Sequence, residues 1–254
     1  MVAVALCLGL LGATTGCEPA ELDQWLTERG RPVLTEPRRT QFAQFVTGLK
    51  AELARRDRFV SAIVPVDAAR LGLSWRPGCP VGPEELRLIS VSFMGFDGAE
   101  RQGEIVVHRD VAPQVEQAFR EMWNERFPIN RMETPERFAR PSDFDPGTGE
   151  YLEKPPQPDT VNDTYGFFCR RSTGGSSWSQ HSYGKALDLN PVQNPYIRRG
   201  VVIPSNGVLD RRSSERGVLT PNSAPVRALK RGGFRWGGEW RTSKDYMHFS
   251  INGR

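Results

Sequence analysis

The pattern of apolar and polar positions predicts both helices and strands along the chain. Apolar residues recur at helical spacing from about Pro37 to Arg56 and again from about Ala112 to Arg126. Thr35 can cap the first helix, and Pro37 suits its first turn. The second helix carries an apolar face that we expect to lie in the core, made of Val115, Phe119, Met122 and Trp123.

Several shorter stretches have the composition of strands and turns. The runs "LRLISVSFMGF" (86–96) and "GEIVVH" (103–108) predict a hairpin joined by the six residues "DGAERQ". Further strand-like runs are "KALDLN" (185–190) and "DYMHFSI" (245–251). The segment Pro141–Asp159 is rich in proline, glycine and acids and predicts a loop or lid that flanks the functional site.

The first seventeen residues, "MVAVALCLGLLGATTGC", favour export. The apolar run is too short to span a bilayer but fits the apolar region of a signal peptide over residues 1–16. Its end places small residues before Cys17, as bacterial lipoprotein signals do. Acylation of Cys17 and cleavage near Gly16 to release a free protein both stay open. Residues 17–70 would then form a tether and an N-terminal helix, and residues 71–254 the main domain.

The cysteines predict a disulfide bond. With the signal removed and Cys17 acylated, Cys79 and Cys169 remain, and an oxidising compartment favours their pairing. The bond would close a long loop, which the chain-entropy model rates at roughly 4–5 kcal/mol. Unpaired buried thiols are the alternative.

Charge gives little sign of a polymer partner. The formal net charge is only +4, and the basic residues are dispersed, which is typical of a solvated surface. The sequence has no basic cluster interleaved with aromatics and no zinc-finger or RNA-binding motif, so we expect no nucleic-acid partner. We expect a monomer that contacts a membrane only through a lipid anchor at Cys17.

Two of the three histidines lie in stretches that could form a metal site. The stretches are "SSWSQHSYGKALDLN" and "FRWGGEWRTSKDYMHFS", and they offer His181, Asp188 and His248 as three N and O ligands, the number that catalytic zinc requires. A single helix over residues 181–188 would separate two of them by about 10 Å along its axis. We therefore expect a turn at 182–184 that leads into a strand and folds His181 back toward Asp188.

Asp245 precedes His248 by three residues, at the start of the predicted strand. There its carboxylate can approach a water molecule activated by the metal. A carboxylate within hydrogen-bond reach of such a water can act as general base while a carbonyl is attacked.

The two motifs together carry a family resemblance. "SQHSYGKALDLNPVQNPY" with "GGFRWGGEWRTSKDYMHF" closely resembles the D-alanyl-D-alanine carboxypeptidase (VanY-type) metallopeptidases, within them the branch that includes L-alanyl-D-glutamate endopeptidases. The likeness runs from about Trp75 to Phe249. The family pattern S-x-H-x-x-G-x-A-x-D matches at Ser179, His181, Gly184, Ala186 and Asp188.

The resemblance assigns roles to single residues. It implies that His181, Asp188 and His248 hold zinc and that Asp245 is the catalytic base. The family also uses an arginine ahead of the first ligand to stabilise the oxyanion, and of the pair in "FFCRRSTGG" we favour Arg170 over Arg171.

The fold that the resemblance implies is α+β: a small antiparallel sheet carrying the zinc ligands, flanked by helices, in a hedgehog-like arrangement. Two departures bear on substrate preference. Phe168 stands where a polar residue is common, and "GGFRW" replaces a more usual Gly-Trp-x-Trp.

The implied function is zinc-dependent hydrolysis of peptide bonds in the peptidoglycan stem peptide, as a D-alanyl-D-alanine carboxypeptidase or an L-alanyl-D-glutamate endopeptidase. One alternative is a zinc-stabilised wall-binding module without catalysis, and another is a thiol endopeptidase that uses Cys169. A serine triad built on Ser179 is disfavoured because no G-x-S-x-G turn accompanies it.

Three tryptophans keep two interpretations each, and the remaining histidine has one. The tryptophans at 178, 236 and 240 could line the cleft, although packing in the core or in turns explains them at least as well. His108 follows the apolar run "IVV" and is interpreted as a histidine at a strand end.

Overall fold

A computed structural model describes residues 44, 47–48, 58–152, 157–172, 175–212 and 215–253. The chain divides into a unit that ends at Phe59 and a second unit from Val60 to Arg254, which carries the features below. The predicted signal peptide, the anchor at Cys17 and most of the helix predicted over Pro37–Arg56 lie outside the described residues. Within that helix, Gln44, Thr47 and Gly48 are described, and all three are helical.

The predicted hairpin forms the middle of a three-stranded antiparallel sheet. Strand β1 (Ser61–Pro65) pairs with β2 (Leu86–Met94), which pairs with β3 (Glu100–His108). The connection spans residues 95–99 and is shorter than the six residues predicted. Gly98 takes a left-handed φ of +79°, and the Gly95 N–H donates to the Ala99 carbonyl at 2.8 Å, so β3 begins at Glu100.

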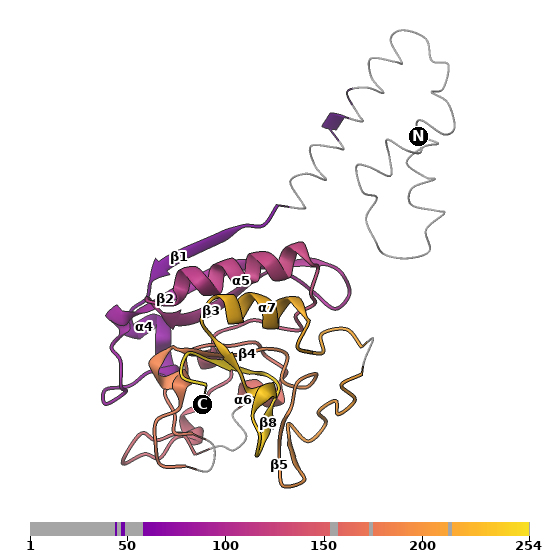
Figure 1. Cartoon of the computed structure of the whole chain (residues 1–254). Helices are drawn as coiled ribbons and strands as arrows, with labels where there is room; N and C mark the ends of the chain where they lie inside the picture. Colours follow the sequence, from indigo (N-terminus) through magenta and orange to yellow (C-terminus); the bar gives the residue numbers. More distant parts are fainter. Residues whose placement is uncertain are drawn as a thin grey trace, which may run out of the picture. The chain divides into compact units, whose positions relative to one another are not determined.

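Two helices pack next to each other, one of them against this sheet. Helix α5 (Ala112–Asn124) contacts β2, and its predicted apolar face is buried, as expected. It ends two residues before the predicted Arg126, which adopts a left-handed φ of +49°. Helix α7 (Ala224–Arg231) lies alongside α5 (Figure 1), where Arg227 pairs with Glu125 at 3.3 Å.

The C-terminal part forms two more three-stranded antiparallel sheets. One has the order β4-β9-β7 and the other β6-β5-β8. Their strands are β4 (Ala186–Asp188), β5 (Tyr196–Arg198), β6 (Val201–Ile203), β7 (Arg235–Trp236), β8 (Lys244–Asp245) and β9 (His248–Ser250). The α+β prediction with small antiparallel sheets is confirmed.

The prediction of "DYMHFSI" as one strand is wrong. Its residues form β8 and β9, which belong to different sheets. Tyr246 lies between these strands, and its backbone makes hydrogen bonds outside both of them. Its N–H donates to the Pro195 carbonyl at 3.3 Å, and its carbonyl accepts from the Trp236 indole at 2.7 Å. The chain therefore changes sheets between Asp245 and His248.

Short helices connect these sheets and the two longer helices. The predicted loop Pro141–Asp159 begins with a 3₁₀ turn and ends inside helix α6. The short elements are α4 (Ala68–Leu71), α6 (Gln157–Thr160), η1 (Gly72–Ser74), η2 (Pro83–Glu85), η3 (Pro135–Arg137), η4 (Pro141–Asp143), η5 (Gln180–Tyr183) and η6 (Gly237–Glu239).

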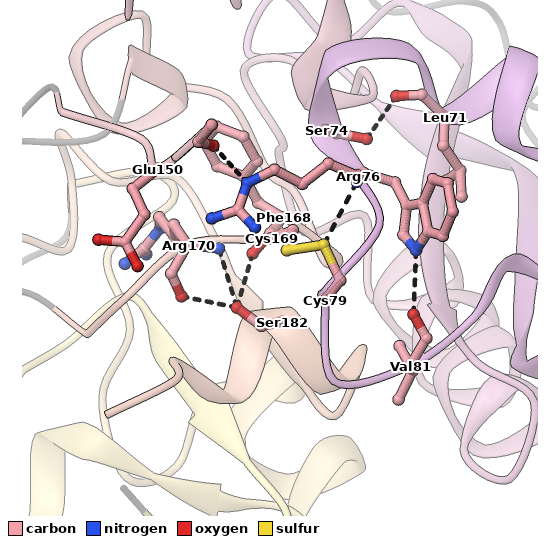
Figure 2. The surroundings of a disulfide bond; sticks show 12 residues. Leu71, Ser74, Arg76, Cys79, Val81, Glu150, Phe168, Cys169, Arg170 and Ser182 are labelled. Carbon is pink, nitrogen blue, oxygen red and sulfur yellow. Dashed lines mark hydrogen bonds between the residues drawn. A yellow bond between two sulfur atoms is a disulfide. The ribbon is translucent and has the colours of Figure 1, made fainter. Parts of the chain in front are cut away.

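The disulfide predicted between Cys79 and Cys169 is present. Their Cα atoms lie 5.9 Å apart, and the bond joins residues 90 positions apart in the chain. Cys169 is buried with Leu86, Val106 and Phe167, and Cys79 packs against the same cluster. Figure 2 shows that Cys169 directly precedes Arg170, so the bond fixes the segment that leads into the site described next. A disulfide is typical of proteins outside the cytoplasm.

Among the described residues, none of the helices combines the length and the apolar character that crossing a membrane would require.

Candidate metal centre

Asp188 and His248 face each other across two paired strands. They are direct partners in the antiparallel pair of β4 and β9, which places both side chains on one face. The Asp188 Oδ1 lies 3.0 Å from His248 Nδ1. Both side chains are buried.

His181 reaches the same point from the 3₁₀ helix η5. Ser179 caps this helix by accepting a bond from the His181 N–H at 3.3 Å. Gly184 ends it at a φ of +64°, and a Cβ there would lie 2.6 Å from the backbone nitrogen of His108, so the position requires glycine. The turn expected at 182–184 is present, and it brings His181 Nε2 to 3.1 Å from Asp188 Oδ2.

The three side chains form a donor set that could hold a metal ion. Their ligand atoms all lie within 4.8 Å of one another, and His181 Nε2 is 3.3 Å from His248 Nδ1. The other ring nitrogen of His181, Nδ1, lies 2.6 Å from the Gly166 carbonyl and can donate to it. If Nδ1 carries the proton in this bond, Nε2 keeps a free lone pair that faces Asp188 and His248 and can bind a metal, as is usual for metal-binding histidines.

The protonation states also suit a cation. Burial lowers the pKa of His181, against the opposing pull of Asp188, and favours the neutral ring. Burial alone would raise the pKa of Asp188, but the two histidines outweigh it and hold that pKa well below its usual range. Neutral imidazole and ionised carboxylate are the forms that bind metals.

A cavity of about 460 Å³ is lined by this group. Among the lining residues are Asp245 from β8, Arg170, and the aromatic side chains Trp178, Tyr196 and Trp240. The other residues that line this cavity are Asp159, Ser172, Ser177, Ser179, Gln180, Ile203, Met247 and Asn252.

Asp245 presents an unpartnered carboxylate oxygen to this environment. The residue is half-buried, but its Oδ1 is shielded from solvent and has no hydrogen-bond partner. Burial raises the pKa of Asp245 to about 7, with His248 opposing the shift and Asp188 adding to it. A carboxyl with such a pKa can gain and lose a proton near neutral pH.

Arg170, not Arg171, lines the cavity. Its backbone N–H donates to Ser182 Oγ at 2.9 Å (Figure 2), and its Nη2 donates to the Tyr165 hydroxyl at 3.1 Å. Its Nε is buried without a partner. Arg171 instead donates to Glu150 at 2.9 Å and lies 3.8 Å over the Trp178 ring.

The remaining candidates divide between the cavity and the core. Trp178 and Trp240 line the cavity, whereas Trp236 is buried and its ring stacks on Phe249. His108 ends β3, with its Nδ1 3.2 Å from Asp110, as the strand-end interpretation expects. Cys169 is held in the disulfide and so offers no thiolate.

Sequence reasoning missed two polar residues beside the metal group. Tyr165 is fully buried, and its ring stacks on His181 with centroids 4.9 Å apart. In the sequence, Asp159 stands out only as the end of the predicted loop, yet its side chain lines the cavity. No fixed spacing links either residue to the ligands, so the only signal was polarity beside the apolar run "YGFF".

Residues 173–251 match a family model described as D-alanyl-D-alanine carboxypeptidase. No curated protein and no solved structure matches the chain. The matched segment contains His181, Asp188, Asp245 and His248, while Arg170 lies just before it. Over residues 173–251, therefore, this chain carries a domain of the D-alanyl-D-alanine carboxypeptidase family.

Proposed function

We propose that the protein is a zinc-dependent peptidase that hydrolyses peptide bonds in the peptidoglycan stem peptide. The family implies a peptidase with peptidoglycan peptides as substrates. The proposed reaction is that of a D-alanyl-D-alanine carboxypeptidase or an L-alanyl-D-glutamate endopeptidase. One observation carries the proposal: a single cavity is lined by the buried His/Asp/His group, by Asp245 and by Arg170.

His181 Nε2, a carboxylate oxygen of Asp188 and His248 Nδ1 would hold the ion. Two imidazoles and one carboxylate are a usual donor set for catalytic zinc, which keeps a further position open. When bound, zinc polarises a water molecule and lowers its pKa toward about 7.

Asp245 is the proposed general base. Its carboxyl group belongs to the cavity lining and would accept a proton from the attacking water, and its near-neutral pKa would let it release that proton to the leaving amine. Asp245 lies on β8, in a different sheet from Asp188 and His248, and lines the same cavity.

Arg170 is the proposed oxyanion stabiliser. Burial alone would lower the pKa of its guanidinium, but Tyr165 and Asp159 outweigh that effect and keep it charged. The bond to Tyr165 fixes the guanidinium, so it need not reorganise as negative charge develops on the carbonyl oxygen.

The proposed location is outside the cytoplasm, at the cell envelope. Residues 1–16 would be the signal peptide, 17–70 the tether and N-terminal helix, and 71–254 the zinc peptidase domain. The protein would be either secreted or anchored by a lipid on Cys17, and it would act as a monomer. The disulfide supports the oxidising compartment.

Incubation of the zinc-loaded protein with purified peptidoglycan tests the proposal, with mass analysis of the released material. A carboxypeptidase releases single D-alanine residues, whereas an endopeptidase releases longer peptide fragments. A non-catalytic wall-binding module would sediment with the wall and release neither. A thiol enzyme would need Cys169 free of its disulfide and would lose activity on alkylation.

A further inference from the structure

Three buried polar atoms without partners lie on residues of the same cavity. Among the described residues, unpartnered buried side-chain atoms occur on Glu136, Asp159, Asp163, Arg170, Arg211 and Asp245. Of these, Asp159, Arg170 and Asp245 line the cavity. A buried polar atom without a partner is costly, so a cluster of them in one cavity indicates a ligand that completes their bonds. The proposed reaction uses Arg170 and Asp245 but gives the unpartnered Oδ1 of Asp159 no role.

Asp159 is held in place by neighbours of the metal group. It lies in α6 and is only 5% exposed. Its carboxyl group interacts with Tyr165, whose hydroxyl accepts a hydrogen bond from Arg170. Burial raises the pKa of Tyr165 well above its usual range, so this hydroxyl stays protonated beside Asp159. The Oδ1 of Asp159 is left as an acceptor without a donor.

The charges of the cavity indicate which donor fits. The lining contains three acidic side chains, those of Asp159, Asp188 and Asp245, and Arg170 is its one Lys or Arg side chain among the residues that the structure describes. Burial raises the pKa of Asp159 well above its usual range, and Asp188 adds to the shift, so the ionised carboxylate of Asp159 lacks compensation in this cavity. That guanidinium already donates to Tyr165 and to the Arg171 carbonyl. A negative group of a substrate would disfavour the ionised form of Asp159 further, whereas a cationic donor would satisfy Oδ1 and stabilise that ionised form.

We propose that Asp159 forms a subsite for a primary ammonium group of the peptide substrate. This inference rests on the proposed function and deepens it, because it selects among peptides by their amines. The ammonium could belong to an amino terminus or to an amine-bearing side chain. Both sources offer the same charged N–H donor, and the arms of the experiment separate them.

The decisive variant is Asp159→Asn, which keeps the size of the side chain but cannot ionise. Three synthetic stem peptides containing lysine serve as substrates: one with both amines free, one acetylated at the amino terminus and one acetylated at the lysine side chain. The wild-type protein should show a KM about 10–100-fold lower for peptides that keep the recognised amine, the range of a hydrogen bond to a charged group. In Asp159→Asn that preference should vanish through KM, and any loss of kcat that acts through Arg170 should be the same for all three peptides.

The matched control is Asp163→Asn. Asp163 is also buried with one unpartnered oxygen, and it does not line the cavity. Its variant should keep the full preference for the amine. The inference is overturned if the wild type shows no preference, or if Asp159→Asn keeps the wild-type preference while slowing all three peptides equally, since Asp159 would then act only through Arg170 or the fold.

Equilibrium binding separates this inference from the proposed function. The same peptides are titrated by calorimetry into zinc-loaded Asp245→Ala protein, with and without Asp159→Asn. If no peptide is ever cleaved but binding still depends on the amine and on Asp159, the proposed function fails and the subsite stands. If cleavage occurs while neither binding nor KM depends on the amine, the subsite is overturned and the proposed function stands.

Discussion

Asp188 and His248 are direct partners across β4 and β9, with Oδ1 and Nδ1 3.0 Å apart, although they lie 60 positions apart in the sequence. The next pair along, Leu187 and Phe249, is fully buried on the other face. A slip of one residue would turn a ligand into the core and a core side chain into the cavity. Burial of this apolar pair therefore fixes the register that assembles the metal group.

Replacing His181 with alanine should abolish metal binding, because it removes one of three ligands and leaves Asp188 with a single histidine. The measurement is metal content by mass spectrometry after dialysis against trace zinc. His108→Ala is the matched control and should keep one zinc per chain, since that histidine lies at the end of β3 with Asp110. Stoichiometric zinc in His181→Ala would remove the basis of the metal assignment.

Asp245→Ala should separate metal binding from catalysis. The three ligands survive, so zinc content and fold should persist, whereas hydrolysis of stem peptides should fall by roughly two to four orders of magnitude, as expected for loss of a general base. The variant should still sediment with cell-wall material. If wild type and variant bind the wall equally and neither cleaves it, the wall-binding module replaces the peptidase.

The two adjacent arginines should differ sharply. Arg170→Ala should lower kcat by about 10²–10³-fold through lost oxyanion stabilisation. Arg171→Ala should change kcat by less than about threefold, because this side chain contacts Glu150 and Trp178 at the protein surface. Steady-state kinetics on one stem peptide makes the comparison, and the opposite ranking would move the role to Arg171.

Residues that belong to a motif or a cysteine pair were predictable even where they lie far apart in the sequence, whereas residues placed by packing alone were not. The spacing of His181 and Asp188 required the turn that η5 and Gly184 provide. The break between β8 and β9 depends on two hydrogen bonds of the Tyr246 backbone, one donated to the Pro195 carbonyl and one accepted from the Trp236 indole, which no local pattern reveals. Asp159 likewise reaches the cavity only through the packing of α6.

The disulfide should carry a large share of the stability of the domain. Peptide mapping of the denatured, non-reduced protein should find neither Cys79 nor Cys169 reactive toward a thiol reagent. A double alanine variant should lower the free energy of unfolding by roughly 4–5 kcal/mol, the chain-entropy value for so long a loop. A free Cys169 whose alkylation abolishes activity would instead favour the thiol enzyme.

The raised pKa of Asp245 predicts how stability depends on pH in the metal-free protein. An unfolded aspartate loses its proton near pH 4, whereas burial keeps folded Asp245 protonated up to about pH 7. The folded state thus binds more protons in this window, and this carboxyl makes stability fall as pH rises through it.

Asp245→Asn cannot titrate, so its stability relative to wild type should rise by about 2–4 kcal/mol between pH 4 and pH 8. Urea unfolding with a chelator, at several pH values, measures the difference. Asp97→Asn is the control: a hydrogen bond from Arg101 lowers the pKa of this exposed carboxyl, so its variant should show no such rise. Parallel pH curves for wild type and Asp245→Asn would mean that folded Asp245 titrates as it does in the unfolded chain, and would remove the near-neutral acid–base pair from the proposed mechanism.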